Sequence, residues 1–226
     1  MQDPINQLQT SHAGLTDSTK EVFETVSKLE CIKDLFLCGG TGISIQLNHR
    51  LSEDLDFELI GTRKERPQLD FGGIIREIKT KFPDANEELI GNDQFLIYIN
   101  NRNVKLSFFR PKNPVKTIDV GLQYNNLKAP TLQNLLGMKM YALCVRTVFR
   151  DYYDIYCLLE KGMQLDEAIS YASYLSRHQI RSKTMYTRLL SPQLFPIGDD
   201  FKKLSPKYDI TPQEIRDRVK KAIESA

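Results

Sequence analysis

The spacing of apolar and polar residues predicts an α+β fold in the first half of the chain. Short apolar or alternating runs, typical of strands, lie between stretches whose apolar residues recur every three or four positions, typical of helices. Residues 1–14 follow neither pattern, and residues 61–67 are expected to form a charged loop. We expect strands at 35–38, through Asp54 and Asp56, at 95–99, at 104–109 and a shorter one at 117–120, with helices from Thr16 or Asp17, from Thr41 to about Arg50 and over 68–82.

The second half carries a different pattern, because no convincing strand follows Pro130. Thr131 is a natural N-cap for a helix, and residues 151–159 begin another. Residues 165–190 favour two helical pieces, and Thr211 with a proline and a glutamate after it opens a last helix. The pattern therefore places a boundary near residue 128.

Composition bounds the class of protein. The 226 residues are 41% hydrophobic and 27% charged, which is typical of a globular protein. No apolar run approaches the roughly 18–20 residues that span a bilayer, so we expect no membrane segment. The chain starts without a basic and then apolar stretch, so we expect no signal peptide and a cytoplasmic location.

Cysteine and histidine usage limits the kind of metal site. The four cysteines have no zinc or redox spacing and are expected to be small buried apolar side chains. The three histidines are scattered. Any bound metal is therefore expected to be a hard cation with oxygen ligands.

Charge is unevenly distributed, although the net charge is only +2. From Arg177 onward there are eleven Lys and Arg residues against six Asp and Glu residues. This basic segment could contact a polyanion, but a solvated helical surface explains it equally well. If RNA binds, the candidate contacts are Arg177, Arg181, Lys183 and Arg188.

The main candidate for chemistry is a glycine turn followed by two carboxylates. Gly39 and Gly40 end an apolar run and precede Thr41, and Asp54 and Asp56 follow roughly a dozen residues later. Alternation along a strand places both aspartates on one face, where they could bind one or two magnesium ions. The glycines would let the backbone approach phosphates, at a helix N-terminus that favours anions.

A plainer interpretation stays open for these aspartates. An edge strand with a solvated acidic face would show the same alternation, and Glu58 on that face fits it too.

A second candidate lies in the helical half. Lys139 is the one basic residue in an otherwise apolar helical stretch, so it either extends to the surface or is directed at phosphates. Asp151 and Asp154 are three residues apart and share a helix side. They could cap the helix and pair with a basic neighbour, or hold Lys139, orient a substrate or accept a proton.

Three blocks together resemble the AbiEii-type nucleotidyltransferase family, the toxin-like members of the DNA-polymerase-β-like nucleotidyltransferase superfamily in bacterial abortive-infection and toxin–antitoxin systems. They lie between residues 35 and 160, and nothing outside that range adds to the resemblance. The blocks are L-C-G-G-T-G-I-S-I-Q-L-N-H-R-L-S-E-D-L-D-F, L-L-G-M-K-M-Y-A-L and R-D-Y-Y-D-I-Y-C-L-L.

The resemblance implies a mixed sheet flanked by helices in residues 1–128, and a helical region, 129–226, that completes the active-site cleft. It also implies transfer of a nucleoside monophosphate from an NTP with Mg²⁺ or Mn²⁺, to an RNA (tRNA included), a protein or a small molecule, and a cognate antitoxin. By that resemblance Gly39 and Gly40 match the phosphate turn, Asp54 and Asp56 the metal pair, Lys139 the helical lysine, and Asp151 and Asp154 the R-D-x-x-D aspartates. Thr41 is expected to bind the triphosphate together with the two glycines.

One departure from the family pattern concerns a third carboxylate on a later strand. The equivalent position here is Ser107, and Asp119 is the alternative source of a carboxylate. The serine favours a second hypothesis, a nucleotide-binding regulatory protein on the same scaffold with weak or no catalysis. A nuclease that uses the same carboxylates is a third.

Overall fold

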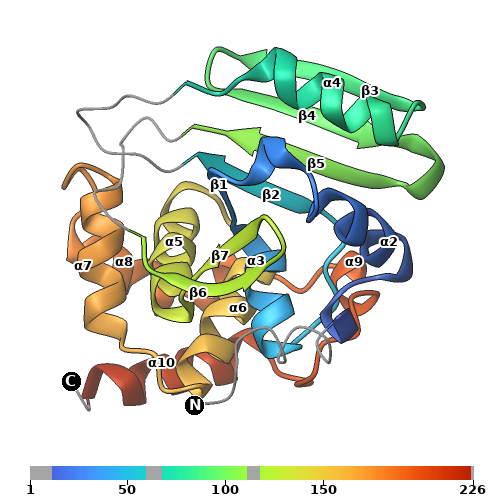
Figure 1. The fold of residues 1–226 in the computed structure, drawn as a ribbon. Coiled ribbons are helices and arrows are strands. Elements are labelled where there is room, and N and C mark those ends of the chain that lie inside the picture. The colour runs from blue at the N-terminus through green and yellow to red at the C-terminus, as the bar shows by residue number, and fades with distance from the viewer. Residues whose placement is uncertain (1–11, 60–67, 111–117, 225–226) are drawn as a thin grey trace, which may run out of the picture. The chain divides into compact units, whose positions relative to one another are not determined.

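The computed structural model describes residues 12–59, 68–110 and 118–224, and divides the chain into two compact units, Met1–Thr131 and Leu132–Ala226. Figure 1 shows a sheet with helices in the first unit and helices in the second. Within the described residues no helix is long and apolar enough to cross a membrane.

The first unit is built on a mixed seven-stranded sheet in the order β3-β4-β5-β2-β1-β7-β6. Strand β2 pairs in parallel with β5 and antiparallel with β1, and β1 pairs in parallel with β7. The aspartate strand β2 therefore lies inside the sheet and not at its edge. The strands are β1 (Leu35–Leu37), β2 (Leu55–Leu59), β3 (Ala85–Gly91), β4 (Gln94–Ile99), β5 (Val104–Phe109), β6 (Val120–Tyr124) and β7 (Leu127–Pro130).

Within the described residues of this unit, three α-helices accompany the sheet. Helix α2 begins as expected after Thr16, whose side-chain oxygen accepts a hydrogen bond from the Thr19 amide at 3.3 Å. Helix α3 begins at Gly39, two residues before the expected Thr41, because the glycine turn itself forms its first turn. The helices are α2 (Asp17–Val26), α3 (Gly39–Leu47) and α4 (Phe71–Lys81), with short 3₁₀ turns η1 (His12–Gly14), η2 (Glu30–Ile32) and η3 (Asn100–Arg102).

One face of the sheet carries the core of this unit. Alternation along β2 directs Leu55, Phe57 and Leu59 to that face, where they are buried against residues of α2 and α4. Phe57, Phe108 and Phe95 stack in sequence across three neighbouring strands, with ring centroids 5.2 Å and 4.8 Å apart. Burial of these rings fixes the register and sends the intervening residues of β2 to the other face.

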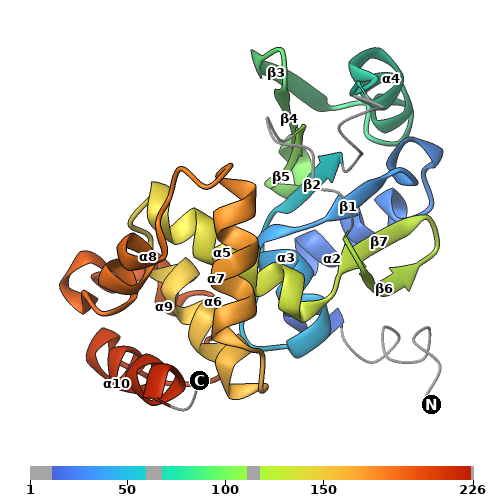
Figure 2. The same cartoon turned by 90° about the vertical axis from the view of Figure 1, so that its left-hand side faces the viewer.

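The second unit is helical, and α5 is its central element. Helix α5 lies against α6, α7 and α8, and α10 lies against α6; Figure 2 shows α7 alongside α5. Tyr152 and Tyr153 are fully buried packing residues. The helices are α5 (Leu132–Val145), α6 (Phe149–Glu160), α7 (Leu165–Leu175), α8 (Ser182–Leu189), α9 (Asp199–Lys202) and α10 (Pro212–Glu224), with the 3₁₀ turn η4 (Pro192–Leu194).

The expected α+β class is confirmed, but three strands were missed. The strands expected at 95–99 and 104–109 are confirmed as β4 and β5, which pair antiparallel across Asn100–Arg102. Strand β3 was missed because all its residues except Ala85 are exposed, so it shows no apolar alternation. Strands β6 and β7 were also missed, since the strand expected at 117–120 shares only Val120 with β6. Position 117 and the loop at 61–67 lie outside the described residues.

Candidate functional site

The glycine turn lies directly beside the second aspartate. Gly39 has a left-handed φ of +64°, and a Cβ atom there would lie 2.6 Å from Asp56 Oδ2. The Cys38 amide donates to the Asp56 carbonyl at 2.8 Å, which fixes the turn to β2. The first turn of α3 therefore presents its N-terminal amides, the donors that a helix leaves without intrahelical partners, next to a carboxylate.

Thr41 connects this turn to the first aspartate. Its hydroxyl lies 2.7 Å from Ser52 Oγ and donates to the Asp54 carbonyl, and the residue is 1% exposed. The side chain is thus engaged inside the protein, while its amide belongs to the first turn of α3.

Arg50 was not singled out in the sequence, and the structure places it against the turn. The residue is 5% exposed, and a Cβ atom on Gly40 would collide with its guanidinium group. Its Nη1 donates to the Leu51 carbonyl at 3.0 Å. A buried cation and the Asp56 carboxylate therefore flank the two glycines. The position of Arg50 in the same R-L-S-E-D-L-D run as the aspartates was the signal available in the sequence.

Lys105 is a second cation that the sequence did not indicate. Its Nζ lies 2.7 Å from Asp54 Oδ2, with the two side chains 35% and 36% exposed. Burial alone would lower the pKa of Lys105, but the hydrogen bond and charge of Asp54 raise it above its ordinary value. Asp54 is therefore already paired with a positive charge.

Ser107 occupies the position on β5 where the family pattern has a third carboxylate. Strands β2 and β5 run parallel, and Ser107 is the register partner of Asp56. Asp119 lies just before β6, and β6 is separated from β2 by β7 and β1. Asp119 therefore does not occupy a β5 position beside Asp56.

Glu58 is not the solvent-exposed carboxylate that a solvated acidic strand face would have. It is 7% exposed and pairs in register with Phe36 on one side and Phe109 on the other. Burial raises the pKa of Glu58 to about 7, against the lowering effect of a hydrogen bond with Cys38. Burial, with the nearby Glu58 and Asp56 carboxylates, raises the pKa of the Cys38 thiol. The β2 acidic face is thus partly buried.

The donor set suits a magnesium ion that arrives with a nucleotide. Asp56 on β2 and Asp54, the residue just before β2, offer hard carboxylate oxygens, whereas no cluster of three His, Cys, Asp or Glu side chains in the described residues is placed to hold a metal alone. Mg²⁺ is usually bound through one or two carboxylates together with substrate phosphates and water. Two carboxylates fit that mode of binding.

The helical unit brings Lys139, Asp151 and Asp154 together. Lys139 Nζ lies 2.7 Å from Asp151 Oδ1 and 2.7 Å from Asp154 Oδ2, and the three side chains are 7%, 1% and 0% exposed. Lys139 therefore does not extend to the surface from its apolar helix; α6 holds it through two carboxylates.

Arg146 completes the charge balance of this cluster. Its Nε and Nη2 donate to Asp151 at 2.6 Å and 2.9 Å, while its side chain stays 57% exposed. Burial would raise the pKa of Asp151, but Lys139 and Arg146 lower it below the ordinary value. Asp151 therefore stays ionised, and two positive side chains meet two negative ones.

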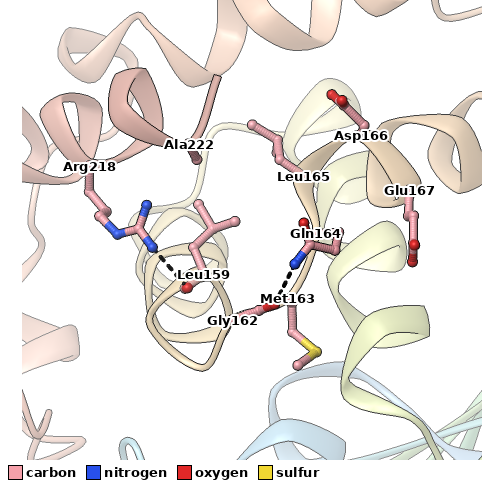
Figure 3. A pocket seen from close by; sticks show the side chains of 9 residues that line it. All are labelled: Leu159, Gly162, Met163, Gln164, Leu165, Asp166, Glu167, Arg218 and Ala222. Atoms are coloured by element: carbon pink, nitrogen blue, oxygen red, sulfur yellow. Dashed lines mark hydrogen bonds between the residues drawn. The ribbon is translucent and has the colours of Figure 1, made fainter. Parts of the chain in front are cut away.

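A pocket of about 450 Å³ lies elsewhere in the helical unit, where α6 ends and α7 begins (Figure 3). Arg218 from α10 lines it and donates to the Leu159 carbonyl at 3.0 Å. None of the residues singled out in the sequence lines this pocket.

The mixed sheet followed by a helical unit belongs to a chain that matches a nucleotidyltransferase family. The family model described as "Nucleotidyl transferase AbiEii toxin, Type IV TA system" matches residues 23–223. The chain belongs to this family, which confirms the resemblance seen in the three sequence blocks.

The chain is also similar to a further protein by sequence and to solved structures. An uncharacterised protein of Aquifex aeolicus (strain VF5) is 30% identical over 159 residues, which are 68% of this chain and 71% of that protein. The crystal structure of a candidate nucleotidyltransferase from H. pylori shares the fold, with a TM-score of 0.53, 14% identity, and coverage of 92% of this chain and 93% of that one. JHP933 from Helicobacter pylori matches with a TM-score of 0.47 and 17% identity, over 93% of this chain and 97% of that one.

Proposed function

We propose that this protein transfers a nucleoside monophosphate from an NTP to a hydroxyl group of an RNA acceptor, tRNA included, with Mg²⁺ or Mn²⁺ as cofactor; a protein or a small molecule is the alternative acceptor. The observation that carries the proposal is the contact between the Gly39 turn and the Asp56 carboxylate at the start of α3. A triphosphate and its metal need such a pair of neighbours, because one binds anions and the other binds cations.

The first turn of α3 supports binding of the triphosphate. The amides of Gly39, Gly40 and Thr41 precede the first intrahelical hydrogen bond, which Gly42 donates to the Cys38 carbonyl at 3.0 Å. Donors at a helix N-terminus favour phosphate oxygens. The buried guanidinium of Arg50 adds positive charge beside Gly40, and the Thr41 hydroxyl positions the turn relative to Asp54.

Asp54 and Asp56 are the proposed metal ligands. When bound there, the ion neutralises charge on the phosphate oxygens and lowers the pKa of an attacking hydroxyl. In the transfer, the acceptor oxygen forms a bond to the α-phosphorus, the bond to the β-phosphate oxygen breaks, pyrophosphate leaves, and the hydroxyl proton passes to solvent. The two aspartates would orient these groups from fixed positions, Asp56 on β2 and Asp54 just before it.

Lys139 is the proposed source of positive charge for the transition state, and Asp151 and Asp154 are its positioning residues. A lysine held by two buried carboxylates has one orientation, so little reorganisation is needed when charge develops on the phosphates.

The family description also names a type IV toxin–antitoxin system. We therefore propose a cognate antitoxin as a functional partner and growth inhibition as the consequence of transfer. The acceptor class and the preferred base are the finer parts of the proposal, and both follow from one labelling experiment.

The experiment incubates the protein with each α-labelled NTP, Mg²⁺ and total RNA, and separates RNA, protein and small molecules. We expect label on RNA, abolished in Asp54→Ala and Asp56→Ala. The matched control is Asp34→Ala, which removes an exposed carboxylate just before β1. Melting curves of all three variants exclude unfolding as the cause.

Other outcomes identify other functions. Label on protein or on a small molecule would reassign the acceptor. Shortened RNA without label would indicate a nuclease. Nucleotide binding without transfer to any acceptor would contradict the proposal and favour a regulatory nucleotide-binding protein. Ser107, in place of a third carboxylate, favours that second hypothesis.

A further inference from the structure

Lys105 forms an ion pair with Asp54, which is one of the two proposed metal ligands. The Nζ to Oδ2 distance is 2.7 Å, which is hydrogen-bond contact. Both side chains keep about a third of their surface in solvent, with exposed fractions of 35% and 36%. The ammonium therefore neutralises Asp54 but is not locked in by burial, so another cation can replace it.

The carboxylate count around this pair is low. Ser107, the register partner of Asp56, supplies a hydroxyl where a carboxylate would add a ligand and a negative charge. Since no cluster of three acidic, histidine or cysteine side chains in the described ranges is placed to hold a metal, the protein alone offers two carboxylates and one competing ammonium. Such a donor set attracts a hydrated divalent cation weakly.

We propose that Lys105 is a resident cation of this site, which occupies Asp54 in the absence of nucleotide and makes divalent-metal binding depend on the nucleotide's phosphates. This inference rests on the proposed function for the identity of the nucleotide. The competition between Lys105 and a metal for Asp54 can be measured without any transfer reaction.

The phosphates of a bound nucleotide favour the metal over Lys105 at Asp54 in two ways. Phosphate oxygens supply the ligands that the protein lacks, which is how Mg²⁺ commonly binds at nucleotide sites. The phosphate oxygens also provide a negative charge for the ammonium of Lys105 to pair with once it has left Asp54. Free metal ions offer neither, and the ammonium retains Asp54.

The test measures binding of Mn²⁺ alone, with no nucleotide, by electron paramagnetic resonance. We expect weak binding to the wild-type protein and an affinity at least about tenfold higher for Lys105→Met, because the variant removes a positive charge at contact distance from a ligand oxygen. The matched control is Lys128→Met, which removes a lysine from β7 whose Nζ lies 5.1 Å from the Phe36 ring centroid. The control should bind Mn²⁺ as the wild type does.

A second variant and a second readout guard against misfolding. Ser107→Asp retains Lys105 and adds the missing carboxylate, and should also raise the Mn²⁺ affinity. Added Mn²⁺ should raise the melting temperature of Lys105→Met more than that of the wild type. Equal Mn²⁺ affinities for wild type and both variants, or tight nucleotide-free binding by the wild type, would overturn the inference. Neither readout involves nucleotide transfer. A failure of this inference can therefore be distinguished from a failure of the proposed function in the labelling experiment.

Discussion

At the scale of single residues, Gly39 illustrates how backbone conformation and charge placement depend on each other. Its φ of +64° lies in the left-handed region, which disfavours side chains, and the space a Cβ would fill is taken by the Asp56 carboxylate. The turn can therefore lie this close to Asp56 only with glycine.

Gly39→Ala is accordingly expected to impair both folding and activity. The left-handed backbone costs about 1–2 kcal/mol for a residue with a side chain, and the new methyl group must displace the Asp56 carboxylate. Gly162→Ala is the matched control, since Gly162 has a φ of +81° but a Cβ there would contact nothing within 4 Å. Urea unfolding should show the backbone cost in both variants and a further loss in Gly39→Ala, where the Asp56 carboxylate must move.

Label transfer separates the two variants. We expect Gly39→Ala to lose most of its transfer activity and Gly162→Ala to retain it. If both variants were equally active, the contact between Gly39 and Asp56 would have no part in the reaction.

The sequence revealed the residues whose neighbours are local and missed those whose neighbours are not. Alternation alone predicted one face for Asp54 and Asp56, although β2 begins at Leu55, one residue after Asp54. Lys105 and Glu58 could not be assigned their surroundings, because these come from pairing between β2 and its neighbouring strands. The burial of Arg50 against Gly40 likewise depends on how the chain returns after α3.

At the scale of elements, burial decided which predictions were correct. Strand β5 was predicted with its observed bounds because Val104, Leu106 and Phe108 alternate as buried residues. Strand β3 was not predicted, because its exposed side chains carry no such signal. Hydrophobic periodicity reports which face is buried, so an exposed strand escapes it.

The α5–α6 cluster is an element-scale feature whose stability can be tested through Lys139→Met. This variant keeps the length of the side chain but leaves Asp154, which is 0% exposed, without the Lys139 charge. Loss of one partner of a buried ion pair typically costs about 3–5 kcal/mol. We expect a loss of that size in the free energy of unfolding.

Arg146→Met provides the comparison from the same cluster. Its side chain is 57% exposed, so its removal should cost no more than about 1 kcal/mol. Urea unfolding followed by circular dichroism measures both variants. A loss for Lys139→Met as small as that for Arg146→Met would show that the cluster does not hold the two helices together.

At the scale of the whole molecule, the charge distribution becomes interpretable only with the helices in place. Residues 168–198 contain four Lys and Arg residues and no Asp or Glu. Arg177 and Arg181 are exposed between α7 and α8, and Lys183 is exposed on α8. Arg188 is half-buried with its Nη2 3.4 Å from the Cys144 carbonyl. The sequence alone left a solvated surface and a polyanion contact equally open.

An RNA acceptor would use this exposed basic turn, and the salt dependence of binding tests it. Each phosphate contact on a single strand contributes about −0.7 to the slope of log affinity against log salt concentration. The double variant Arg181→Gln with Lys183→Gln should therefore flatten the slope by about 1.4 and lower transfer to RNA. Nucleotide binding should stay unchanged, because neither residue belongs to the proposed nucleotide site.

Lys202→Gln with Lys203→Gln is the matched control, because it removes two exposed charges of the same unit beside acidic neighbours. Binding is measured by fluorescence anisotropy of labelled RNA across a salt series, with transfer assayed on the same RNA. An unchanged slope in the Arg181→Gln, Lys183→Gln variant would show that these two side chains do not contact RNA phosphates. A flattened slope there, with none in the control, would locate the acceptor on the α7–α8 turn, since loss of net charge alone would affect both variants equally.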